Sequence, residues 1–354
     1  MILVVNAGSS SIKVELFDGA LASVMDGAVT EIGGSGRLKV GETAQDVTAQ
    51  DHVDALSLLV SAFDRAGHPV SDLTAAGHRV VHGGAELTAP ARLTPDVVAG
   101  IEACIPLAPL HNPHNLSGIH ALAELAPDLP QFASFDTGFH ATNALLATTY
   151  AIPQAERDKG IRRYGFHGLS YAGMVAQFGD ALPPRLLAMH LGNGASLCAI
   201  LDGKSVATSM GYSPLDGLVM GTRCGNIDGM AVLRMASDHG IDRAGALLNK
   251  ESGLKALAGT NDMAALLARQ DEAARFAVDH FCYWAARQAG SAITAMHGVD
   301  AIAFTGGIGE NAAAVRQGIM DHLSWLGDLP VHVVPADEER QIARDTRTLM
   351  GSCG

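Results

Sequence analysis

An internal repeat constrains the fold of this chain more than any other feature. Residues 192–203 (GNGASLCAILDG) repeat the organisation of residues 8–19 (GSSSIKVELFDG), and the same offset of 184 residues separates Gly8 from Gly192 and Asp18 from Asp202. Each copy follows an apolar run, passes through a turn of small residues and returns as a second apolar stretch, which is the pattern of a β-hairpin. Two such hairpins half a chain apart predict two similar domains.

The turns of these hairpins favour phosphate. Glycine has no Cβ, so an anion can approach the backbone N–H groups of a glycine-rich turn, and neighbouring Ser and Asn side chains add polar contacts. We therefore expect a phosphate-containing ligand held between the two similar domains.

Composition limits the class of protein. The chain has 354 residues, 48% of them hydrophobic, which is enough for two domains with cores of their own. Its formal net charge is −13, from 24 basic and 37 acidic residues, and the acidic residues are scattered. Binding to a nucleic-acid backbone requires clustered Lys and Arg, so nucleic acid is not an expected partner.

Cysteine usage and hydropathy indicate a compartment. Cys104, Cys198, Cys224, Cys282 and Cys353 are odd in number, far apart and without a C-x-x-C pair, which indicates a reducing cytosol rather than disulfide bonds or a zinc site. The chain shows neither a targeting segment nor an uncharged apolar run of membrane-spanning length. We expect a soluble, cytoplasmic protein with no membrane partner.

Hydrophobic periodicity predicts alternating α and β segments. Strands are expected at 1–33 and 186–209, as two hairpin meanders, and at 73–81, 131–136, 299–304 and 331–334. Helices are expected at 51–68, 95–104, 115–126, 169–178, 228–239, 242–250, 262–268, 271–297, 311–323 and 337–349. Turns or loops are expected at 109–114, 160–168 and 305–311.

Charged side chains follow several of the predicted strands. Arg79 lies at the end of one strand, Asp136 ends another, and Arg223 lies in a glycine-flanked loop. Arg in such a place offers a rigid fork for two hydrogen bonds to a carboxylate or a phosphate. Two such arginines, one carboxylate and phosphate-binding turns fit transfer of a phosphoryl group to an anionic acceptor.

Other motifs compete with this interpretation. The sequence G-G-I-G at 306–309 could also open a dinucleotide-binding helix, but there is no Walker A pattern and no G-x-G-x-x-G after the first strand. The pair His78 and His82 invites a metal-site interpretation, which its predicted strand position disfavours. Asp136-Thr-Gly is also the triplet of aspartic proteases, whose chemistry needs two carboxylates, and no second copy occurs.

Eight motifs, in order, resemble those of the acetate kinase family. They are NAGSSSIK (6–13), HRVVHGG (78–84), PLHNP (109–113), FDTGFH (135–140), YGFHG (164–168), HLGNG (190–194), GTRCG (221–225) and FTGGIGEN (304–311), and they span nearly the whole chain. The resemblance implies an α/β fold of two duplicated actin-like (ribonuclease H-like) domains with a nucleotide cleft between them. It places residues 1–143 and 340–354 in the N-terminal domain and residues 144–339 in the C-terminal domain, which carries the nucleotide-binding loops.

The resemblance also implies a function. The family carries out ATP-dependent, reversible phosphorylation of a short-chain carboxylate with Mg²⁺, acetate giving acetyl phosphate and ADP, usually as a homodimer. Two alternatives stay open, namely a kinase that prefers propionate and a non-catalytic nucleotide-binding clamp of the same superfamily. Retention of Arg79, Asp136, His167 and Arg223 together favours an enzyme, because a binding module needs no acceptor site.

Those four residues would be catalytic by resemblance. Arg79 and Arg223 would hold the acceptor carboxylate and the moving phosphoryl group, and His167 would donate to the transferring oxygens. A carboxylic acid titrates near ~4.3 and is already ionised at neutral pH, so its phosphorylation needs no general base. Asp136 is therefore interpreted as a residue that orders the metal and the reacting groups.

Further positions would bind ligands by the same resemblance. Arg79, His111 and Asn193 would bind substrate, although the residues alone leave a purely structural turn open for His111. Asn6 and Glu338 would lie at the metal. The positions expected around the nucleotide are Ser11, Lys13, His190, Gly192, Asn193, Gly194, Asp262, Gly306, Gly307, Gly309 and Asn311.

The chain departs from the family pattern at three places. The usual D-I-D-P after the G-T-R-x-G motif becomes residues 226–229 (NIDG), and the usual G-T-S-H after His167 becomes residues 168–171 (GLSY). An Arg expected two residues after Asp262 is Ala264, which removes a cationic contact to the nucleotide. We expect selection of the nucleotide base to be weaker than recognition of the phosphates.

Overall fold

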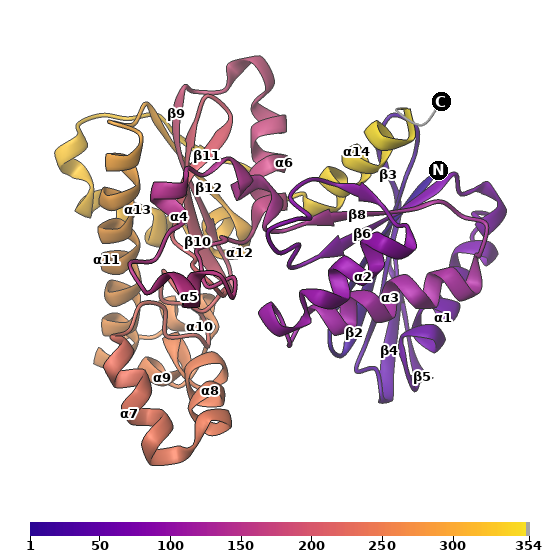
Figure 1. The fold of residues 1–354 in the computed structure, drawn as a ribbon, viewed down its shortest axis with the longest axis horizontal. Helices are drawn as coiled ribbons and strands as arrows, with labels where there is room; N and C mark the ends of the chain where they lie inside the picture. Colours follow the sequence, from indigo (N-terminus) through magenta and orange to yellow (C-terminus); the bar gives the residue numbers. More distant parts are fainter. Residues whose placement is uncertain (352–354) are drawn as a thin grey trace. The chain divides into compact units, whose positions relative to one another are not determined.

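The computed structural model describes residues 1–351, which form two compact units (Figure 1). One unit comprises residues 1–139 together with the segment that begins at residue 337, and the other comprises residues 140–336. The domain bounds expected from the sequence differ from these by a few residues and remain predictions.

The first unit is built on a sheet with the strand order β5-β4-β3-β2-β1-β6-β8-β7. Strands β1, β6 and β8 run parallel, whereas β2 to β5 form an antiparallel meander. β1 is central, and its unbroken apolar run reflects burial on both faces. The strands are β1 (Ile2–Ala7), β2 (Ser11–Phe17), β3 (Ser23–Thr30), β4 (Gly34–Val40), β5 (Thr43–Ala49), β6 (Ala75–Val80), β7 (Ala91–Arg92) and β8 (Gln131–Phe135).

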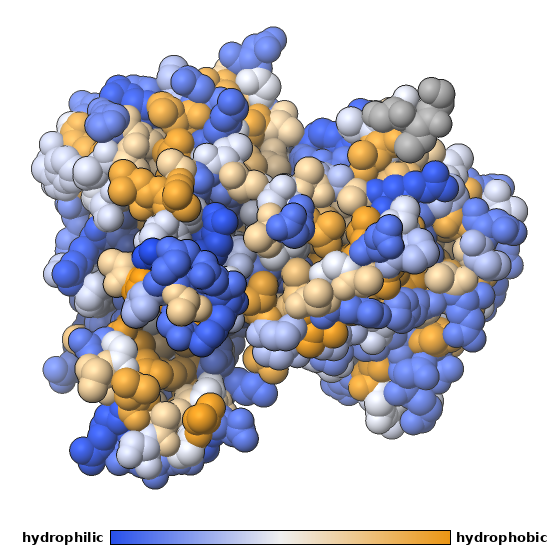
Figure 2. Space-filling view, in the orientation of Figure 1, coloured by the Kyte–Doolittle hydropathy of each residue, from blue (hydrophilic) through white to orange (hydrophobic). Residues whose placement is uncertain are grey.

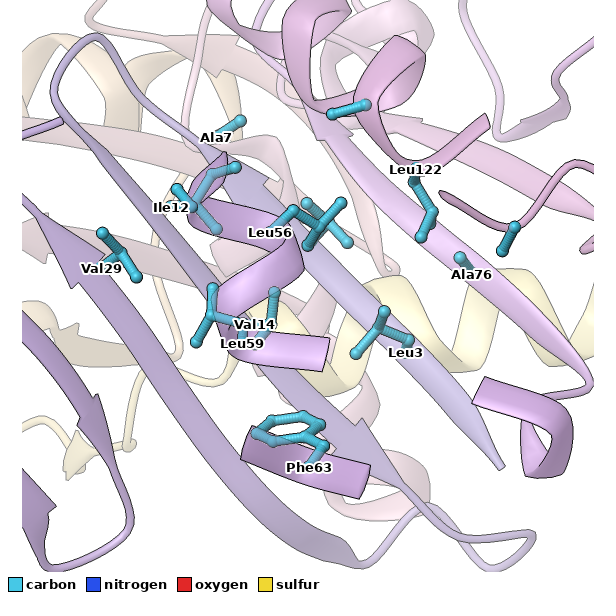
Figure 3. Close-up of a cluster of buried hydrophobic side chains, with 14 of the residues drawn as sticks. Leu3, Ala7, Ile12, Val14, Val29, Leu56, Leu59, Phe63, Ala76 and Leu122 are labelled. Atoms are coloured by element: carbon cyan, nitrogen blue, oxygen red, sulfur yellow. The ribbon is translucent and has the colours of Figure 1, made fainter. Parts of the chain in front are cut away.

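Helices cover both faces of this sheet. They are α1 (His52–Arg65), α2 (Pro95–Ala103), α3 (Asn112–Leu125) and α14 (Glu338–Gly351). Leu56 and Phe63 of α1 pack with Ala76 of β6 in the core on one face (Figure 3). The next strand residue, Gly77, points the other way, where a Cβ would lie 2.7 Å from Ile342 Cγ2, so α14 covers the opposite face.

The second unit has a sheet with the strand order β11-β10-β9-β12-β13. Its strands are β9 (Arg185–Leu191), β10 (Ala195–Leu201), β11 (Lys204–Thr208), β12 (Ala301–Thr305) and β13 (Val331–Val333). Its helices are α4 (Leu145–Thr148), α5 (Gln154–Arg157), α6 (Gly168–Phe178), α7 (Gly229–His239), α8 (Ile241–Lys250), α9 (Gly253–Ala258), α10 (Met263–Leu267), α11 (Glu272–Ala295), α12 (Gly306–Asn311) and α13 (Ala313–His322). The long α11 packs against the sheet and against α13.

The structure confirms the repeat found in the sequence. The order β3-β2-β1-β6-β8 in the first unit corresponds to β11-β10-β9-β12-β13 in the second, with the same strand directions at each step. Both predicted hairpins are present. Their turns differ by one residue, because Ala7 pairs with Ile12 in the first hairpin and Leu191 pairs with Ala195 in the second.

Three local expectations were wrong. Strands β4 and β5 occupy residues 34–49, where no element was expected, because most of their side chains are polar and exposed. Helix α3 begins within the expected turn 109–114, since Pro113 lies in its first turn, where a missing N–H costs no hydrogen bond. Helix α12 forms where a loop was expected. Its three glycines have low helix propensity, so the sequence did not indicate a helix.

The surface mixes residue types. Figure 2 shows hydrophobic residues scattered among hydrophilic ones on the face that it presents. In the part of the chain that the structure describes, no helix combines the length and apolarity needed to cross a membrane.

Candidate active site

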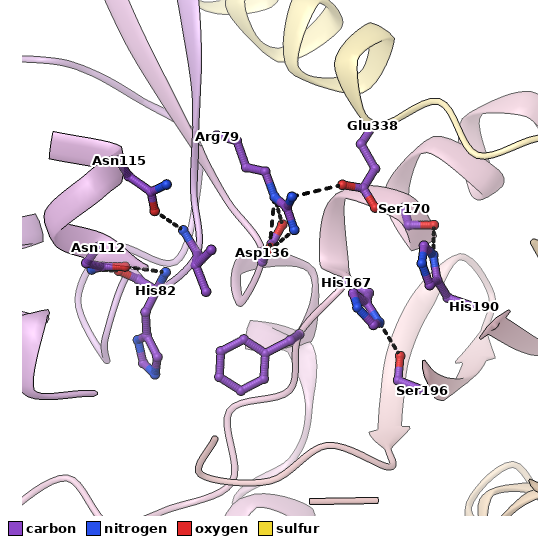
Figure 4. Close-up of polar contacts among 12 residues, drawn as sticks. Arg79, His82, Asn112, Asn115, Asp136, His167, Ser170, His190, Ser196 and Glu338 are labelled. Atoms are coloured by element: carbon purple, nitrogen blue, oxygen red, sulfur yellow. Dashed lines mark hydrogen bonds and ion pairs between the residues drawn. The ribbon is translucent and has the colours of Figure 1, made fainter. Parts of the chain in front are cut away.

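Arg79 and Asp136 form the centre of a cluster in the first unit. Arg79 lies near the end of β6, and Asp136 directly follows β8, the parallel neighbour of β6, so both reach the same edge of the sheet. Nη2 of Arg79 donates to Oδ2 of Asp136 over 2.7 Å, and Nε donates to both carboxylate oxygens over 3.2 Å (Figure 4). The Asp136 side chain is only 2% exposed and that of Arg79 is 23% exposed, so the carboxylate of this forked ion pair is the buried partner.

Glu338 joins the cluster from the first residue of α14. Its Oε2 lies 3.7 Å from Nη1 of Arg79, so two carboxylates share one guanidinium and negative charge is in excess. Burial alone would lower the pKa of Arg79, but attraction to Asp136 and Glu338 outweighs burial and holds that pKa above its ordinary value. Arg79 therefore stays charged.

Asn6 reaches the same edge from β1. Because Val5 pairs in register with His78, Asn6 lies beside Arg79 along the sheet. The sequence predicted this placement at the end of a strand for Arg79 and for Asp136. The neighbouring His78 is buried, and its ring lies 2.7 Å from Gln131 Oε1, which gives it a structural hydrogen bond.

The remaining predicted residues of the first unit lie farther from this pair. His111 precedes the first residue of α3 and is near enough to Asp136 to interact with it electrostatically. Ser11 begins β2, and Lys13 is exposed on the same strand. Within residues 1–351, no hydrogen bond or ion pair joins the side chain of Ser11 or Lys13 to the cluster.

Two buried asparagines hold the backbone that follows Arg79. Oδ1 of Asn112 accepts a hydrogen bond from the His82 N–H over 3.1 Å, and its Nδ2 donates to the His82 carbonyl over 3.0 Å. Oδ1 of Asn115 accepts from the Val81 N–H over 3.0 Å, and its Nδ2 donates to the Ala7 carbonyl over 2.8 Å. Asn115 thereby ties the ends of β1 and β6 together. Sequence reasoning missed both residues, although polar side chains beside two prolines were the available signal.

In the second unit, the rings of His167 and His190 stack. Their centroids are 4.2 Å apart and their planes differ by 26°. Nδ1 of His167 lies 2.8 Å from Ser196 Oγ, and Nδ1 of His190 lies 2.8 Å from Ser170 Oγ (Figure 4). Each ring is therefore held through its Nδ1 atom.

Glycines surround the Nε2 edges of both rings. A Cβ at Gly194 would lie 3.2 Å from Nε2 of His167 and 3.6 Å from Nη1 of Arg223. A Cβ at Gly306 would lie 3.2 Å from Nε2 of His190. The structure therefore brings His167, His190, Arg223 and the predicted phosphate turns to one place, and a larger residue at the glycine positions would fill it.

Arg223 presents a guanidinium without a counter-charge. Its Nη1 donates to the Pro214 carbonyl over 3.1 Å and lies 3.6 Å from Met220 Sδ, and Arg223 forms no ion pair within the described chain. Burial lowers the pKa of Arg223. Position 226, where the family pattern has a carboxylate, holds Asn226, whose Oδ1 accepts from the Gly217 N–H over 2.7 Å. A half-buried cation with neutral neighbours suits an anionic ligand.

A pocket of about 300 Å³ lies beside the turn at residues 192–194. Its wall is apolar in part and carries a few polar groups, which is typical of sites for small ligands. Its lining residues are Gly192, Asn193, Asn261, Asp262, Met263, Ala264, Leu267, Gly307, Ile308, Asn311 and Ala312. Asn193 is fixed there, since its Oδ1 accepts from Asn261 Nδ2 over 3.0 Å.

Some predicted nucleotide residues make structural bonds. Oδ1 of Asp262 caps α10 by accepting from the Ala264 N–H over 2.9 Å. The Gly306 N–H donates to Glu310 Oε1 over 3.0 Å. A Cβ at Gly309 would lie 3.5 Å from the Phe304 carbonyl carbon, an ordinary van der Waals contact, so packing of α12 on β12 does not itself require glycine there. Their nucleotide roles remain predictions.

A model of the acetokinase family matches residues 1–347. The chain belongs to the acetokinase family. The acetate kinase of Nitrobacter hamburgensis is 41% identical to it, over 99% of this chain and 96% of that protein.

Solved structures of family members are similar in fold as well. The crystal structure of Porphyromonas gingivalis acetate kinase superposes with a TM-score of 0.92 at 33% identity, covering 99% of both chains. A propionate kinase from Francisella tularensis gives 0.93 at 34% identity, covering 97% of this chain and 98% of that one. The expected fold class, α/β with duplicated actin-like domains, is confirmed.

Proposed function

We propose that this protein transfers the γ-phosphoryl group of ATP to acetate, reversibly, giving acetyl phosphate and ADP. Membership of the acetokinase family supports the proposal, as do relatives named acetate kinase and propionate kinase. Arg223 is the single observation that carries it. Its half-buried guanidinium lies beside a glycine turn and His167 and lacks a counter-charge, which a carboxylate or phosphoryl group would supply with forked hydrogen bonds.

Each proposed catalytic residue then has a limited task. Arg79 and Arg223 hold the acceptor carboxylate and the moving phosphoryl group, and His167 donates from Nε2 to the transferring oxygens. These donors stabilise charge that develops in the transition state. The acceptor is already ionised, so Asp136, which Arg79 holds in a forked ion pair, orders the site without abstracting a proton.

The donor set of the first unit fits Mg²⁺. Asp136 and Glu338 share only one guanidinium, and their remaining negative charge suits a divalent cation. Mg²⁺ is usually bound by one or two carboxylates with substrate phosphates and waters, and Asn6 adds an amide oxygen at the same edge. The bound cation would neutralise charge on the phosphates. Within residues 1–351 no three or more His, Cys, Asp or Glu side chains form a metal-binding group.

The pocket in the second unit is the proposed nucleotide site. Met263, Leu267 and Ile308 offer apolar wall for a base and ribose, while the 192–194 turn faces the phosphates. Ala264 supplies no cation to the base, so recognition rests on shape and on the phosphates.

We also propose a cytoplasmic homodimer without nucleic-acid partners. The cysteines at positions 104, 198, 224 and 282 are free, as expected in a reducing compartment, whereas Cys353 lies outside the described residues. Met230 and Leu233 of α7 are 71% and 61% exposed, which supports burial by a second copy. Light scattering after size exclusion, compared with a Met230→Lys/Leu233→Lys variant, tests the dimer.

Acyl phosphate trapped as a hydroxamate tests the activity. Purified protein with ATP and Mg²⁺ is expected to give hydroxamate with acetate and with propionate, and no phosphorylated product with glycerol or hexoses. A higher kcat/KM for propionate would assign the preference to the larger acid. ATP binding without any acyl phosphate would instead support the non-catalytic clamp and overturn the proposal.

A further inference from the structure

Tyr171 and Ser196 form a hydrogen-bonded line that ends at His167. The Tyr171 hydroxyl lies 2.5 Å from Ser196 Oγ, and Ser196 Oγ lies 2.8 Å from Nδ1 of His167. Tyr171 and Ser196 are both fully buried, so bulk water does not compete for these bonds. We propose that Tyr171 is a positioning residue that sets the protonation pattern of the His167 ring through Ser196.

The surroundings keep the Tyr171 hydroxyl on this line. The Tyr171 N–H donates to the His167 carbonyl over 3.1 Å at the start of α6, which couples the two residues through the backbone. The Tyr171 ring meets the ring of His140 edge to face, with centroids 5.8 Å apart. His140 is itself held by Ser205 Oγ at 2.8 Å and the Phe166 carbonyl at 3.0 Å. The phenol ring is therefore packed in one orientation.

The acidities of the two hydroxyl groups give the proposed line its direction. A phenol is more acidic than an alkyl hydroxyl and is the better donor, so Tyr171 donates to Ser196. In the proposed arrangement Ser196 directs its single proton to Nδ1 of His167, the other polar atom within hydrogen-bond distance of its Oγ. Nδ1 must be unprotonated to accept it, and the proton of the neutral imidazole is on Nε2.

The consequence depends on the proposed phosphoryl transfer. Nε2 of His167 points toward Gly194 and Arg223, where the transferring oxygens are proposed to bind, and it can donate to them only when it carries the proton. The other ring of the stack, His190, is held at its Nδ1 by a different residue, since Ser170 Oγ lies 2.8 Å from that atom. The Tyr171 hydroxyl therefore acts on His167 through Ser196, at the Nδ1 atom.

Kinetics of Tyr171→Phe test this role. We expect kcat to fall about tenfold while KM for acetate and for ATP stays within about twofold, since an interaction made in the transition state is weakened. In a His167→Ala background, Tyr171→Phe should cause no further loss, because the two residues act as one unit. Equal losses in both backgrounds, or a wild-type kcat in Tyr171→Phe, would overturn the proposal.

Tyr164→Phe is the matched control. It removes a phenolic hydroxyl from the same unit, one that donates to the Gly160 carbonyl over 2.9 Å, and it should leave kcat within about twofold in both backgrounds. Thermal unfolding of each variant verifies that it is folded before its kinetics are compared.

Long-range ¹H–¹⁵N correlation spectra of the His167 ring give a readout that needs no activity. Wild-type protein should show the Nε2–H tautomer, and Tyr171→Phe a mixture of both tautomers. An Nδ1–H tautomer in the wild type would overturn the inference even if Tyr171→Phe failed to fold. Absence of acyl phosphate from the wild type would refute the proposed function and leave this measurement unaffected.

Discussion

Each unit has its own sheet, with five strands in the same order, but the two units differ in the charges around their arginines. Both contain the same order of five strands and a matching hairpin. Arg79 of the first unit is bound by Asp136 and Glu338, whereas Arg223 of the second meets only the Pro214 carbonyl and Met220 Sδ in the hydrogen bonds described.

This difference separates two uses of arginine. An arginine with counter-charges of its own fixes the protein's carboxylates, and its fork is largely satisfied before a ligand arrives. An arginine that is partly removed from water without a counter-charge is destabilised, and binding of an anion offsets that destabilisation. A duplicated backbone can therefore carry an ordering site in one unit and an anion-receiving site in the other.

The difference between the two arginines should be clearest in the stability of their Ala variants. We expect Arg79→Ala to lower the free energy of unfolding by about 3–5 kcal/mol, because Asp136 becomes a buried charge without its partner. Arg223→Ala should change it by no more than about 1 kcal/mol, since no ion pair is lost. Urea unfolding of both variants measures the difference.

A second substitution provides the control for this prediction. Asp136→Asn in the Arg79→Ala background removes the orphaned charge and should recover part of the loss. Equal destabilisation by the two Arg→Ala substitutions would show that the charge difference between the units has no energetic weight.

The same two substitutions should have similar effects on catalysis. Arg79→Ala and Arg223→Ala are each expected to lower kcat by about 10²–10³, the usual effect of removing one preorganised donor to developing charge. Lys should rescue either position poorly, because a point charge cannot reproduce the forked geometry. Hydroxamate assays measure the rates, and Arg234→Ala, which removes an arginine that is 78% exposed on α7, is the matched control. A near-normal rate in either of the first two variants would remove that residue from the mechanism.

The sequence predicted what depends on local pattern. Alternation of apolar residues and small-residue turns located both hairpins, and residues at strand ends located Arg79 and Asp136, because parallel strands bring their carboxyl ends to one edge. Strands β4 and β5 escaped notice because exposed polar strands lack that alternation.

Residues that act through tertiary contacts could not be predicted. Asn115 links Ala7 to Val81, and Ser196 meets Tyr171 from another element, so neither partner can be inferred from sequence spacing. The absence of a counter-charge at Arg223 is also a property of the packed structure. Only the loss of a carboxylate at Asn226 hinted at it.

Acid should act on both units through buried histidines. Burial lowers the pKa of His78 in the first unit and of His140 in the second to about 4. Histidines in the unfolded chain take up these protons first, because their pKa there is the ordinary ~6.5. The stabilisation is therefore complete above that pH and is lost as pH falls toward 4.

Between pH 7 and pH 5, wild type should lose about 2 kcal/mol more unfolding free energy than His78→Gln. Urea unfolding at both pH values measures this, and His239→Gln, at an exposed position on α7, should follow wild type. Parallel curves for wild type and His78→Gln would contradict the prediction.

The choice of nucleotide as phosphoryl donor should show the smallest effect, and it concerns only the second unit. The pocket beside residues 192–194 has Ala264 where the family pattern has Arg, so base contacts are weakened while the phosphate turn is kept. We expect kcat/KM for ATP and GTP to agree within about tenfold, or about 1.4 kcal/mol.

Ala264→Arg should then change KM for the nucleotide more than kcat, because a contact to the base is the same in the ground and transition states. Ala265→Arg, at the neighbouring position of α10 outside the pocket lining, is the control for added charge. A preference for ATP of about a hundredfold would mean that groups other than residue 264 read the base, and turnover with pyrophosphate alone would show that the phosphate turn works without the nucleoside pocket.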